Sequence, residues 1–453
     1  MKTIVPAAEL VMRILGRQTR QTGADYRLLR FCIQCTVEDE TLIYNPLTLE
    51  LLLLSQKEMN SLTENEELIS KWFLVPNEQD DFALADRLHE IAVSVQKPID
   101  YINHYTIFTT TDCNARCYYC FEQGCVRKNM SKDTANRLVQ YITEHSGGKT
   151  ARLHWFGGEP LVNQEAIDTI CQGLTNAGVQ YRSSIVSNGY LFDKPMIQKA
   201  KALWHLERAQ ITLDGTEEVY NRTKAFINSD DNPFQRVLNN IELLLNAGIH
   251  VSVRLNVGEE NWQDLLRLAD QLAERFMGQK GFFVYPSPLH LQVNDEPKWI
   301  LTHSNTLTEK YQKVRERLIQ LKLYGDGRLA RSIKVTQCIA NNDSAVVVLP
   351  DGKLGCCEHF LESEIFGDIN SEEKDLTMLA DWKERTPLGQ ECSDCSYYPQ
   401  CYRLKKCPGG RACTGLEREM TEKRLRLQML NEYYICTNKK AAESEDYLPT
   451  ENC

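Results

Sequence analysis

Short apolar runs alternate with helical patterns through the middle of the chain. The β-branched and aromatic residues of 105–110 are typical of a strand. Further strand-like runs follow at residues 153–156, 185–186, 209–213, 249–257 and 282–285. Helical patterns lie between them at 131–145, where Ser131 is a suitable N-cap, and at 164–177 and 234–247. Because strands that alternate with helices form parallel sheets, this part of the chain is expected to adopt an α/β fold.

The first 98 residues have a different pattern. Residues 31–37 and 41–45 are predicted to form two strands joined by the acidic turn Glu38-Asp39-Glu40, and a third apolar run occupies 47–55. Helical patterns follow at 64–72 and 81–95, and the stretch 75–81 is predicted to be a loop. A small sheet followed by helices indicates a separate N-terminal domain.

Composition limits the class of protein. A chain of 453 residues is long enough for two or three domains. It has no apolar run of about 18 residues, so no membrane span is expected, and its N-terminus lacks the unbroken apolar core of a signal peptide. We therefore expect a cytoplasmic protein, in which the 17 cysteines indicate metal binding or catalysis rather than disulfides. The net charge of −10 argues against a nucleic-acid partner.

The strongest chemical signal is the run CNARCYYC, which contains Cys113, Cys117 and Cys120. Three closely spaced thiolates can hold three corners of a 4Fe–4S cluster and leave the fourth iron open to another ligand. A zinc site is the alternative, but zinc usually takes paired C-x2-C motifs, which this spacing fits poorly. The triplet follows the predicted strand 105–110, and α/β barrels build their sites at the carboxyl ends of strands.

Three further motifs follow the predicted strands: Gly157-Gly158-Glu159-Pro160, Ser187-Asn188-Gly189 and Leu213-Asp214-Gly215. Together with the cysteine triplet they resemble the radical S-adenosylmethionine (SAM) superfamily. The resemblance covers roughly residues 100 to 330. It implies a partial (β/α)6 TIM-like barrel, an open iron that chelates SAM, and a 5′-deoxyadenosyl radical that abstracts a hydrogen atom from the substrate.

The resemblance also assigns SAM-binding roles. The backbone of Gly157 and Gly158, with Glu159, is expected to meet the SAM amino group, and glycine suits a close approach of backbone to a ligand. Ser187 and Asn188 are expected to face the ribose or the carboxylate.

One position departs from the family pattern. Many members carry His-Asp-x-x-Arg shortly after the third motif, and that arginine grips the SAM carboxylate. This chain reads Tyr220-Asn-Arg222-Thr-Lys224, with Lys224 at the expected position and Arg222 two residues earlier. Either cation can pair with a carboxylate, although only Arg does so as a planar fork. The sequence does not choose between them.

A second cysteine-rich region follows in the C-terminal third. Its spacings resemble the SPASM domain, an extension of radical SAM enzymes that holds two auxiliary 4Fe–4S clusters, so that three clusters are expected in all. By position, one auxiliary cluster would take Cys392, Cys395, Cys401 and Cys413, and the other would take Cys338, Cys357 and Cys407. The gap between Cys401 and Cys407 is longer than in many members, which leaves the assignment of Cys407 and Cys413 open.

Two neighbours of Cys357 remain ambiguous. Cys356 is adjacent and could replace it or act as a fourth ligand, although adjacent side chains on an extended segment point opposite ways. Glu358 is a candidate general base, and a solvated surface glutamate is the plainer interpretation. A zinc ribbon is the alternative for the whole region.

The N-terminal pattern resembles the small winged-helix element that binds the leader peptides of ribosomally made, modified peptides. Together the resemblances imply three domains: a winged-helix-like peptide recognition domain at 1–98, a radical SAM partial barrel at 99–330 and a SPASM domain at 331–453. The expected function is that of an oxidoreductase that installs a thioether or carbon–carbon crosslink in a ribosomal precursor peptide. The leader would bind the N-terminal domain, unless that domain only covers the barrel, and a flavodoxin or ferredoxin-type protein would donate electrons. Alternatives are an enzyme similar to anaerobic sulfatase maturases, acting on a folded protein, and a zinc-binding interaction protein.

Overall fold

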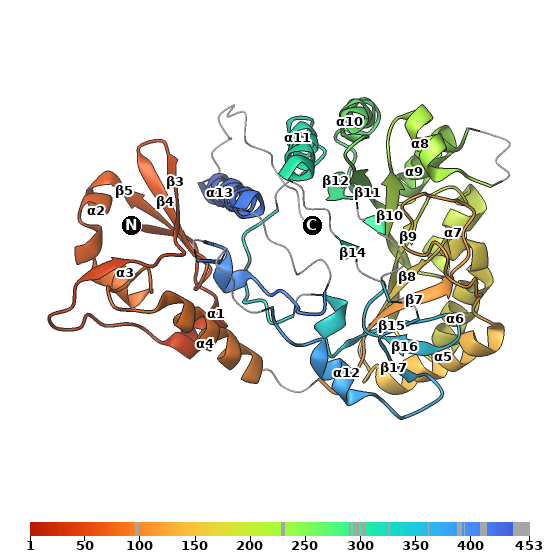
Figure 1. Ribbon diagram of the computed structural model, residues 1–453, viewed down its shortest axis with the longest axis horizontal. Helices are drawn as coiled ribbons and strands as arrows, with labels where there is room; N and C mark the ends of the chain where they lie inside the picture. The colour runs from red at the N-terminus through yellow and green to blue at the C-terminus, as the bar shows by residue number, and fades with distance from the viewer. Residues whose placement is uncertain are drawn as a thin grey trace.

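A nine-stranded sheet dominates the computed structural model. The structure describes residues 1–95, 99–227, 232–289, 291–292, 299–300, 305–324, 327–336, 338–360, 362–386, 392–393, 395–407 and 415–437 (Figure 1). Strand order in the sheet is β12-β11-β10-β9-β8-β7-β15-β16-β17. The parallel strands are β7 (His104–Thr110), β8 (Ala151–Gly157), β9 (Tyr181–Ser187), β10 (Leu206–Leu213), β11 (His250–Val257) and β12 (Phe282–Pro288).

Helices follow these strands, and the three predicted at 131–145, 164–177 and 234–247 are among them as α5, α6 and α9. They are α5 (Lys132–His145), α6 (Gln164–Asn176), α7 (Lys194–Ala202), α8 (Glu217–Lys224), α9 (Pro233–Asn246), α10 (Trp262–Phe276) and α11 (Asn305–Gln320), with a short η2 (Pro160–Asn163). The Ser131 side chain accepts a hydrogen bond from the Thr134 amide and caps α5. The predicted α/β partial barrel is therefore confirmed. None of the helices in the described ranges has the length and apolar content of a membrane span.

Apolar and polar side chains alternate along the strands, so that one face of the sheet is apolar and buried and the other is polar. Trp155, Ile211 and Val253 are fully buried in the core beneath the helices. Burying side chains of this size stabilises the fold by about 2–3 kcal/mol each. Neighbouring positions in the same strands, such as His154 and Arg254, are only half-buried and belong to the opposite face of the sheet. The barrel therefore offers a polar inner surface.

Three strands from late in the chain complete this sheet: β15 (Ala345–Val348), β16 (Lys353–Gly355) and β17 (Ile365–Asp368). Strand β15 pairs in parallel with β7, with Val347 beside Thr106. Cys338 of the second cysteine-rich region precedes β15, and its Cys356 and Cys357 directly follow β16. The remaining small elements of this region are η3 (Ile339–Asn341), α12 (Leu376–Asp381) and η5 (Tyr398–Gln400), and a ladder of β13 (Leu291–Gln292) with β14 (Trp299–Ile300) lies between α10 and α11 in sequence.

The N-terminal residues form a four-stranded antiparallel sheet in the order β1 (Lys2–Val5), β5 (Glu50–Ser55), β4 (Glu40–Asn45) and β3 (Ile33–Val37). The predicted hairpin is confirmed, with Val37 paired to Glu40. The predicted loop 75–81 is wrong at its start, because β6 (Leu74–Pro76) pairs with β2 (Tyr26–Leu28). The helical elements are α1 (Glu9–Leu15), α2 (Gln56–Asn60), η1 (Leu62–Glu64), α3 (Glu66–Ser70) and α4 (Asp81–Ser94). A winged-helix identity remains a prediction.

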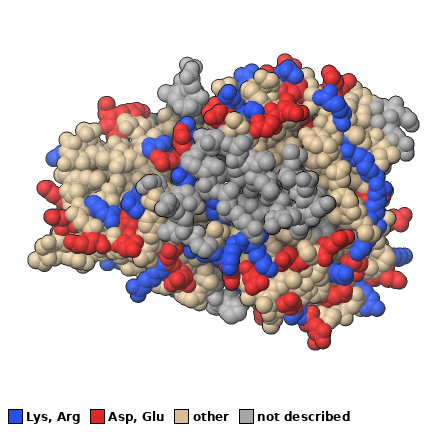
Figure 2. Space-filling view, in the orientation of Figure 1, with Lys and Arg blue, Asp and Glu red and all other residues tan. Residues whose placement is uncertain are grey.

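The last described helix, α13 (Gly415–Thr437), contacts both the N-terminal lobe (residues 1–95) and α11 of the lobe that contains the barrel. It lies between the N-terminal sheet and α11 (Figure 1). Leu425, Met429 and Tyr433 of α13 share one hydrophobic core with residues of the N-terminal sheet such as Leu42. On the face shown in Figure 2, acidic and basic side chains are interspersed over both lobes, so the net negative charge is not gathered in one patch there.

Candidate active site

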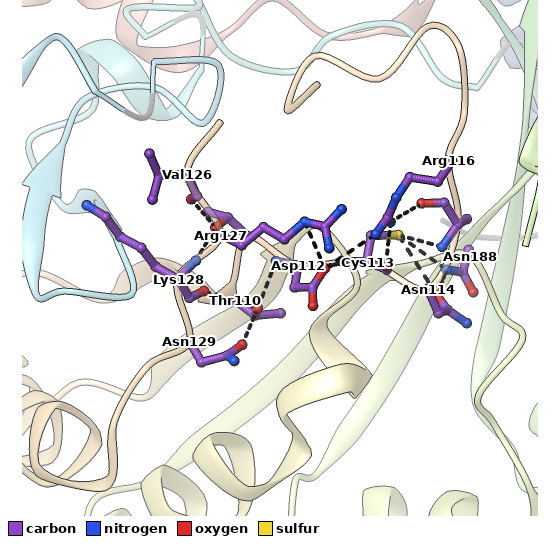
Figure 3. Close-up of polar contacts among 12 residues, drawn as sticks. Thr110, Asp112, Cys113, Asn114, Arg116, Val126, Arg127, Lys128, Asn129 and Asn188 are labelled. Atoms are coloured by element: carbon purple, nitrogen blue, oxygen red, sulfur yellow. Dashed lines mark hydrogen bonds and ion pairs between the residues drawn. The ribbon is translucent and has the colours of Figure 1, made fainter. Parts of the chain in front are cut away.

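The loop that carries the cysteine triplet is closed at its base by hydrogen bonds (Figure 3). The Thr110 hydroxyl donates to the Asn129 side chain at 2.5 Å and accepts from the Asp112 amide at 2.9 Å. The Thr111 amide donates to the carbonyl of Lys128 at 2.9 Å. Strand β7 therefore holds both ends of the loop, and the cysteines lie at the carboxyl edge of the sheet.

The three thiols of the loop are partly buried and lie near one another. Burial, with smaller contributions from the negative charges of Glu159, Cys117 and Cys120, raises the pKa of Cys113 to about 12. Burial likewise raises the pKa of Cys120 to about 11. Without a metal these thiols are therefore protonated, and binding a metal must release their protons.

The donor set of this loop consists of soft thiols, which fit an iron–sulfur cluster. Among the described residues, no three His, Cys, Asp or Glu side chains converge closely enough for one metal ion. The ligands of a cube bind different irons and so stand farther apart than the ligands of one ion. A loop of soft thiols, with the Ala115 amide donating to the Cys113 sulfur at 3.3 Å, fits this requirement.

Gly157 and Gly158 lie against the start of the cysteine loop. Gly157 has a φ of +122°, and a Cβ there would stand 2.1 Å from the Thr110 carbonyl oxygen. A Cβ on Gly158 would stand 2.3 Å from the Asp112 carbonyl oxygen. The amides of Gly158 and Glu159 already donate to these two carbonyls, at 3.1 and 2.9 Å. The glycines are therefore needed to seat the loop on β8, whatever ligand lies beside them.

The Glu159 carboxylate is fully buried and bonded to the end of β9. It accepts hydrogen bonds from the Ser187 hydroxyl at 2.9 Å and the Asn188 amide at 2.8 Å. Burial raises the pKa of Glu159 to about 7, although these donors oppose the rise. Glu159 thus fixes Ser187 and Asn188 in place. Of this group, Asn188 reaches the cysteine loop. Its side-chain nitrogen Nδ2 donates a hydrogen bond to the Asn114 side chain at 2.7 Å and lies 3.9 Å from the Cys113 sulfur.

Lys224 lies at the end of α8 in a buried polar network. Its ammonium is 3.0 Å from the Asp214 carboxylate and donates to the Tyr119 hydroxyl at 3.0 Å. Tyr119 donates to Asp214 at 2.8 Å, as does Asn256 at 3.0 Å. Burial alone would lower the pKa of Lys224, but the negative charge of the Asp214 carboxylate raises it well above its usual value. A charged lysine therefore stands beside the cysteine loop.

Arg222 is not brought to the site. Its side chain is 69% exposed, against 4% for Lys224, and it forms an ion pair of 3.4 Å with Glu218 on the outside of α8. The two residues are half a helical turn apart, so they point in different directions. The structure thus separates two cations that the sequence left equivalent.

The second cysteine-rich region brings together one predicted ligand set. Burial raises the pKa of the Cys357 thiol, and the charges of Glu358, Cys338 and Cys407 raise it further. Burial also raises the pKa of the Cys338 thiol, and the charge of Cys407 contributes to that rise. These three thiols therefore lie near one another, and Glu358 lies beside them. Cys356 is separate: it is buried, with Glu364 and Lys406 as its charged neighbours.

The other ligand set lies on one short arc. The Cys395 amide donates to the Cys392 carbonyl at 3.2 Å, and the Cys401 amide donates to the Tyr398 carbonyl at 3.0 Å. The fourth predicted ligand, Cys413, lies outside the described residues. A compact arc of soft thiols is compatible with an iron–sulfur cluster and also with zinc.

Polar residues of the barrel interior were missed by sequence reasoning. The Tyr285 hydroxyl donates to the Gln210 side chain at 2.6 Å, and the His154 ring nitrogen lies 2.8 Å from the Ser184 hydroxyl. Arg254 is paired in register with Tyr285 on the neighbouring strand. Each is a polar position within an otherwise apolar strand, which was the available signal. They form a hydrophilic surface facing the space that a substrate would enter.

The fold and the cysteine loop together define the class. Residues 107–272 match the family model described as the radical SAM superfamily. Over these residues the chain is therefore similar to a radical SAM domain, and the members of that superfamily are enzymes. SAM and one 4Fe–4S cluster are the cofactors that this domain implies.

Curated relatives match at low identity. An uncharacterized protein of Methanocaldococcus jannaschii is 27% identical over 26% of this chain and 41% of its own length. The radical SAM cyclopropyl synthase TigE of Paramaledivibacter caminithermalis is 22% identical over 45% of this chain and 44% of its own. A GTP 3′,8-cyclase of Clostridium perfringens is 24% identical over 61% and 87%. The chain thus spans about two fifths of the first curated relatives it matches.

Two solved structures share the fold. The protein named anSMEcpe, solved with bound AdoMet and Cp18Cys peptide, has a TM-score of 0.53 at 15% identity and covers 74% of this chain and 99% of its own. Streptococcus suis SuiB bound to S-adenosylmethionine has a TM-score of 0.51 at 12% identity and covers 96% of this chain and 99% of its own. At these identities the likeness concerns the fold alone.

Proposed function

We propose that this chain is a radical SAM maturase that installs a thioether or carbon–carbon crosslink in a ribosomally made precursor peptide. The single observation that carries the proposal is the extent of the SuiB fold, which covers 96% of this chain, whereas anSMEcpe covers 74%. A match over 96% of the chain includes most of its first 95 residues, and this extent favours a peptide maturase with a recognition domain over a sulfatase-maturase-like enzyme.

The N-terminal sheet supports a role in binding the leader. Strand β3 is the edge of that sheet, and an edge strand can accept an extended peptide through its main chain. The Arg426 side chain of α13 donates to the Gln34 carbonyl on this strand. A leader that adds to β3 would share or replace that contact. A domain that only covers the barrel is the alternative for this part of the chain.

The chain's own residues would prepare the radical step. When bound to a reduced cluster, SAM supplies a 5′-deoxyadenosyl radical that abstracts a hydrogen atom from the substrate. Glu159 holds Ser187 and Asn188 towards the SAM site, and Lys224 offers a fixed positive charge beside the Cys113 loop. Because Asp214 already neutralises Lys224, we assign Lys224 to positioning the loop first and to pairing with the SAM carboxylate second.

The second cysteine-rich region would take part in forming the crosslink after the hydrogen atom is removed. Cys338, Cys357 and Cys407 would hold an auxiliary cluster that either binds a substrate thiolate or accepts the second electron. The charge of Glu358 acts on Cys357 and also on His154 in the barrel interior, so this carboxylate is available to both regions. We assign to Glu358 the proton that leaves the substrate. Electrons for each turnover would come from a flavodoxin or ferredoxin-type protein.

The experiment uses the anaerobically purified enzyme with SAM, dithionite and the small precursor peptide encoded beside its gene. We expect 5′-deoxyadenosine and a peptide that has lost two hydrogen atoms, detected by mass spectrometry. If 5′-deoxyadenosine forms and every neighbouring precursor keeps its mass, the peptide-maturase assignment is wrong.

A further inference from the structure

The arc from Cys392 to Cys401 is anchored on the N-terminal domain. Tyr398, which lies three residues from both Cys395 and Cys401, is 9% exposed. Its ring stacks on Phe31 at 5.9 Å between centroids and meets the edge of Phe82 at 4.8 Å. Its hydroxyl donates to the Asp86 carboxylate at 2.7 Å. Every one of these partners belongs to the first 95 residues.

A second anchor stands beside the first. Gln400 is 4% exposed, and its side-chain amide donates to the Pro46 carbonyl at 2.8 Å in a buried environment. The residue precedes Cys401, whose own amide donates to the Tyr398 carbonyl. The backbone that presents the Cys401 thiol is therefore fixed at two successive points by the N-terminal domain.

Asp86 of α4 contacts Tyr398 and also Arg385, a residue that precedes Cys392 in the sequence. Arg385 donates to the Cys401 carbonyl at 3.0 Å and lies 3.5 Å from Asp86. The Arg385 guanidinium also lies over the Tyr402 ring, which packs on His89 of α4 at 4.7 Å. One carboxylate thus contacts both Tyr398 and Arg385, and through them the segment on either side of Cys401.

Burial joins these contacts into one unit. Phe31, Ala85, Leu88 and Tyr398 belong to a single hydrophobic core, and Cys392 and Cys395 pack against it. The Cys113 loop belongs instead to the barrel, whose core is a separate cluster of residues. Loss of the contacts on α4 is therefore expected to affect the arc without affecting the barrel.

We propose that the N-terminal domain forms one wall of the auxiliary iron–sulfur site at Cys392, Cys395 and Cys401, and that Tyr398 is its positioning residue. The inference rests on the auxiliary clusters of the proposed function and adds to it. The domain expected to bind the leader is also required to hold a cluster. Recognition and redox chemistry would then share one structural unit, and the domain is more than a detachable cover.

The test compares anaerobically reconstituted holoenzyme variants by iron content and Mössbauer spectroscopy. Tyr398→Ala and Phe82→Ala should each lower the iron content from about twelve to about eight per chain, the loss of one 4Fe–4S cluster. Tyr398→Phe, which keeps the ring contacts, should restore most of that iron. Tyr181→Phe is the matched control, because it removes a buried hydroxyl that donates to the Leu203 carbonyl at 2.6 Å within the barrel.

The cluster at Cys113 should still support formation of 5′-deoxyadenosine in every variant, which shows that the barrel is folded. Wild-type enzyme with three clusters and unchanged iron in both alanine variants would overturn this inference alone. Wild-type enzyme with a single cluster would overturn it together with the auxiliary part of the proposed function. Where Phe82→Ala prevents folding of the N-terminal domain, Phe82→Leu provides the same comparison with a smaller change in volume.

Discussion

The two cysteine-rich regions are built in different ways. The loop of Cys113, Cys117 and Cys120 lies at the end of one strand and is seated by backbone hydrogen bonds from β7 and β8. The second region collects its thiols from several places in the chain, among them Cys338 at the start of η3, Cys357 after β16 and Cys401 after η5, and part of it rests on the N-terminal domain. A site on one sheet edge is specified by local motifs, whereas a composite site depends on contacts between distant segments.

Because the two cysteine-rich regions are built from different segments, we expect that the cluster of the Cys113 loop can be removed without loss of the auxiliary clusters. Replacing Cys113, Cys117 and Cys120 together with alanine should reduce SAM cleavage to background and remove about four irons per chain. The auxiliary irons should remain, because their ligands belong to other segments. Iron analysis and chromatography of 5′-deoxyadenosine measure both effects. Loss of all iron in this variant would mean that the regions are not independent.

The next prediction concerns the two cations of α8. Lys224→Met leaves the Asp214 carboxylate buried without its partner, which should cost about 3–5 kcal/mol of stability and weaken the SAM site. Arg222→Met removes only an exposed pair worth about 0.3–0.5 kcal/mol. Urea unfolding and the KM for SAM should respond to the first change and not to the second. Equal effects of the two variants would contradict the positions of these side chains.

A smaller effect is expected at Gly157. Gly157→Ala must move the Thr110 carbonyl, and overpacking of this kind costs about 1–3 kcal/mol. Gly178→Ala is the matched control, because Gly178 also has a positive φ, of +71°, but has no atoms within 4 Å of the added Cβ. The difference between their unfolding free energies reports the contact with the cysteine loop together with the greater backbone strain of alanine at a φ of +122°. It should be accompanied by weaker retention of the Cys113 cluster.

The smallest effect concerns Glu122, two residues after Cys120. One of its carboxylate oxygens has no hydrogen-bond partner among the described residues, and burial raises its pKa to about 8. Because the folded state holds this proton more tightly than the unfolded state, stability should fall as pH rises from about 4.5 to about 8 and then level off. We expect a loss on the order of 1–2 kcal/mol, less than the full shift would give, after relaxation around the charge.

Glu122→Gln should abolish that part of the pH dependence. The exposed Glu144→Gln on α5 is the control and should leave it unchanged. Thermal unfolding at pH 5 and pH 8.5 provides the measurement. If wild type and Glu122→Gln lose stability equally over this range, Glu122 is not the group responsible.

The comparison of regions also explains what the sequence could predict. The parallel strands and the order of the motifs followed from apolar runs, because strand, loop and helix are local properties. The choice between Arg222 and Lys224 did not follow, since it depends on which side of α8 faces Tyr119 and Asp214. Nor did the pairing of β15 with β7, which joins residues more than two hundred positions apart. The role of Tyr398 was invisible for the same reason, because its partners lie in another domain.

We propose above all that the Cys113 loop would hold the cluster at which SAM is cleaved. The direct measurement is the yield of 5′-deoxyadenosine from SAM by the reconstituted, dithionite-reduced wild-type enzyme. We expect 5′-deoxyadenosine in amounts that grow with time and require both reductant and SAM. Reconstituted enzyme that carries its full iron content, binds SAM and forms no 5′-deoxyadenosine would contradict it.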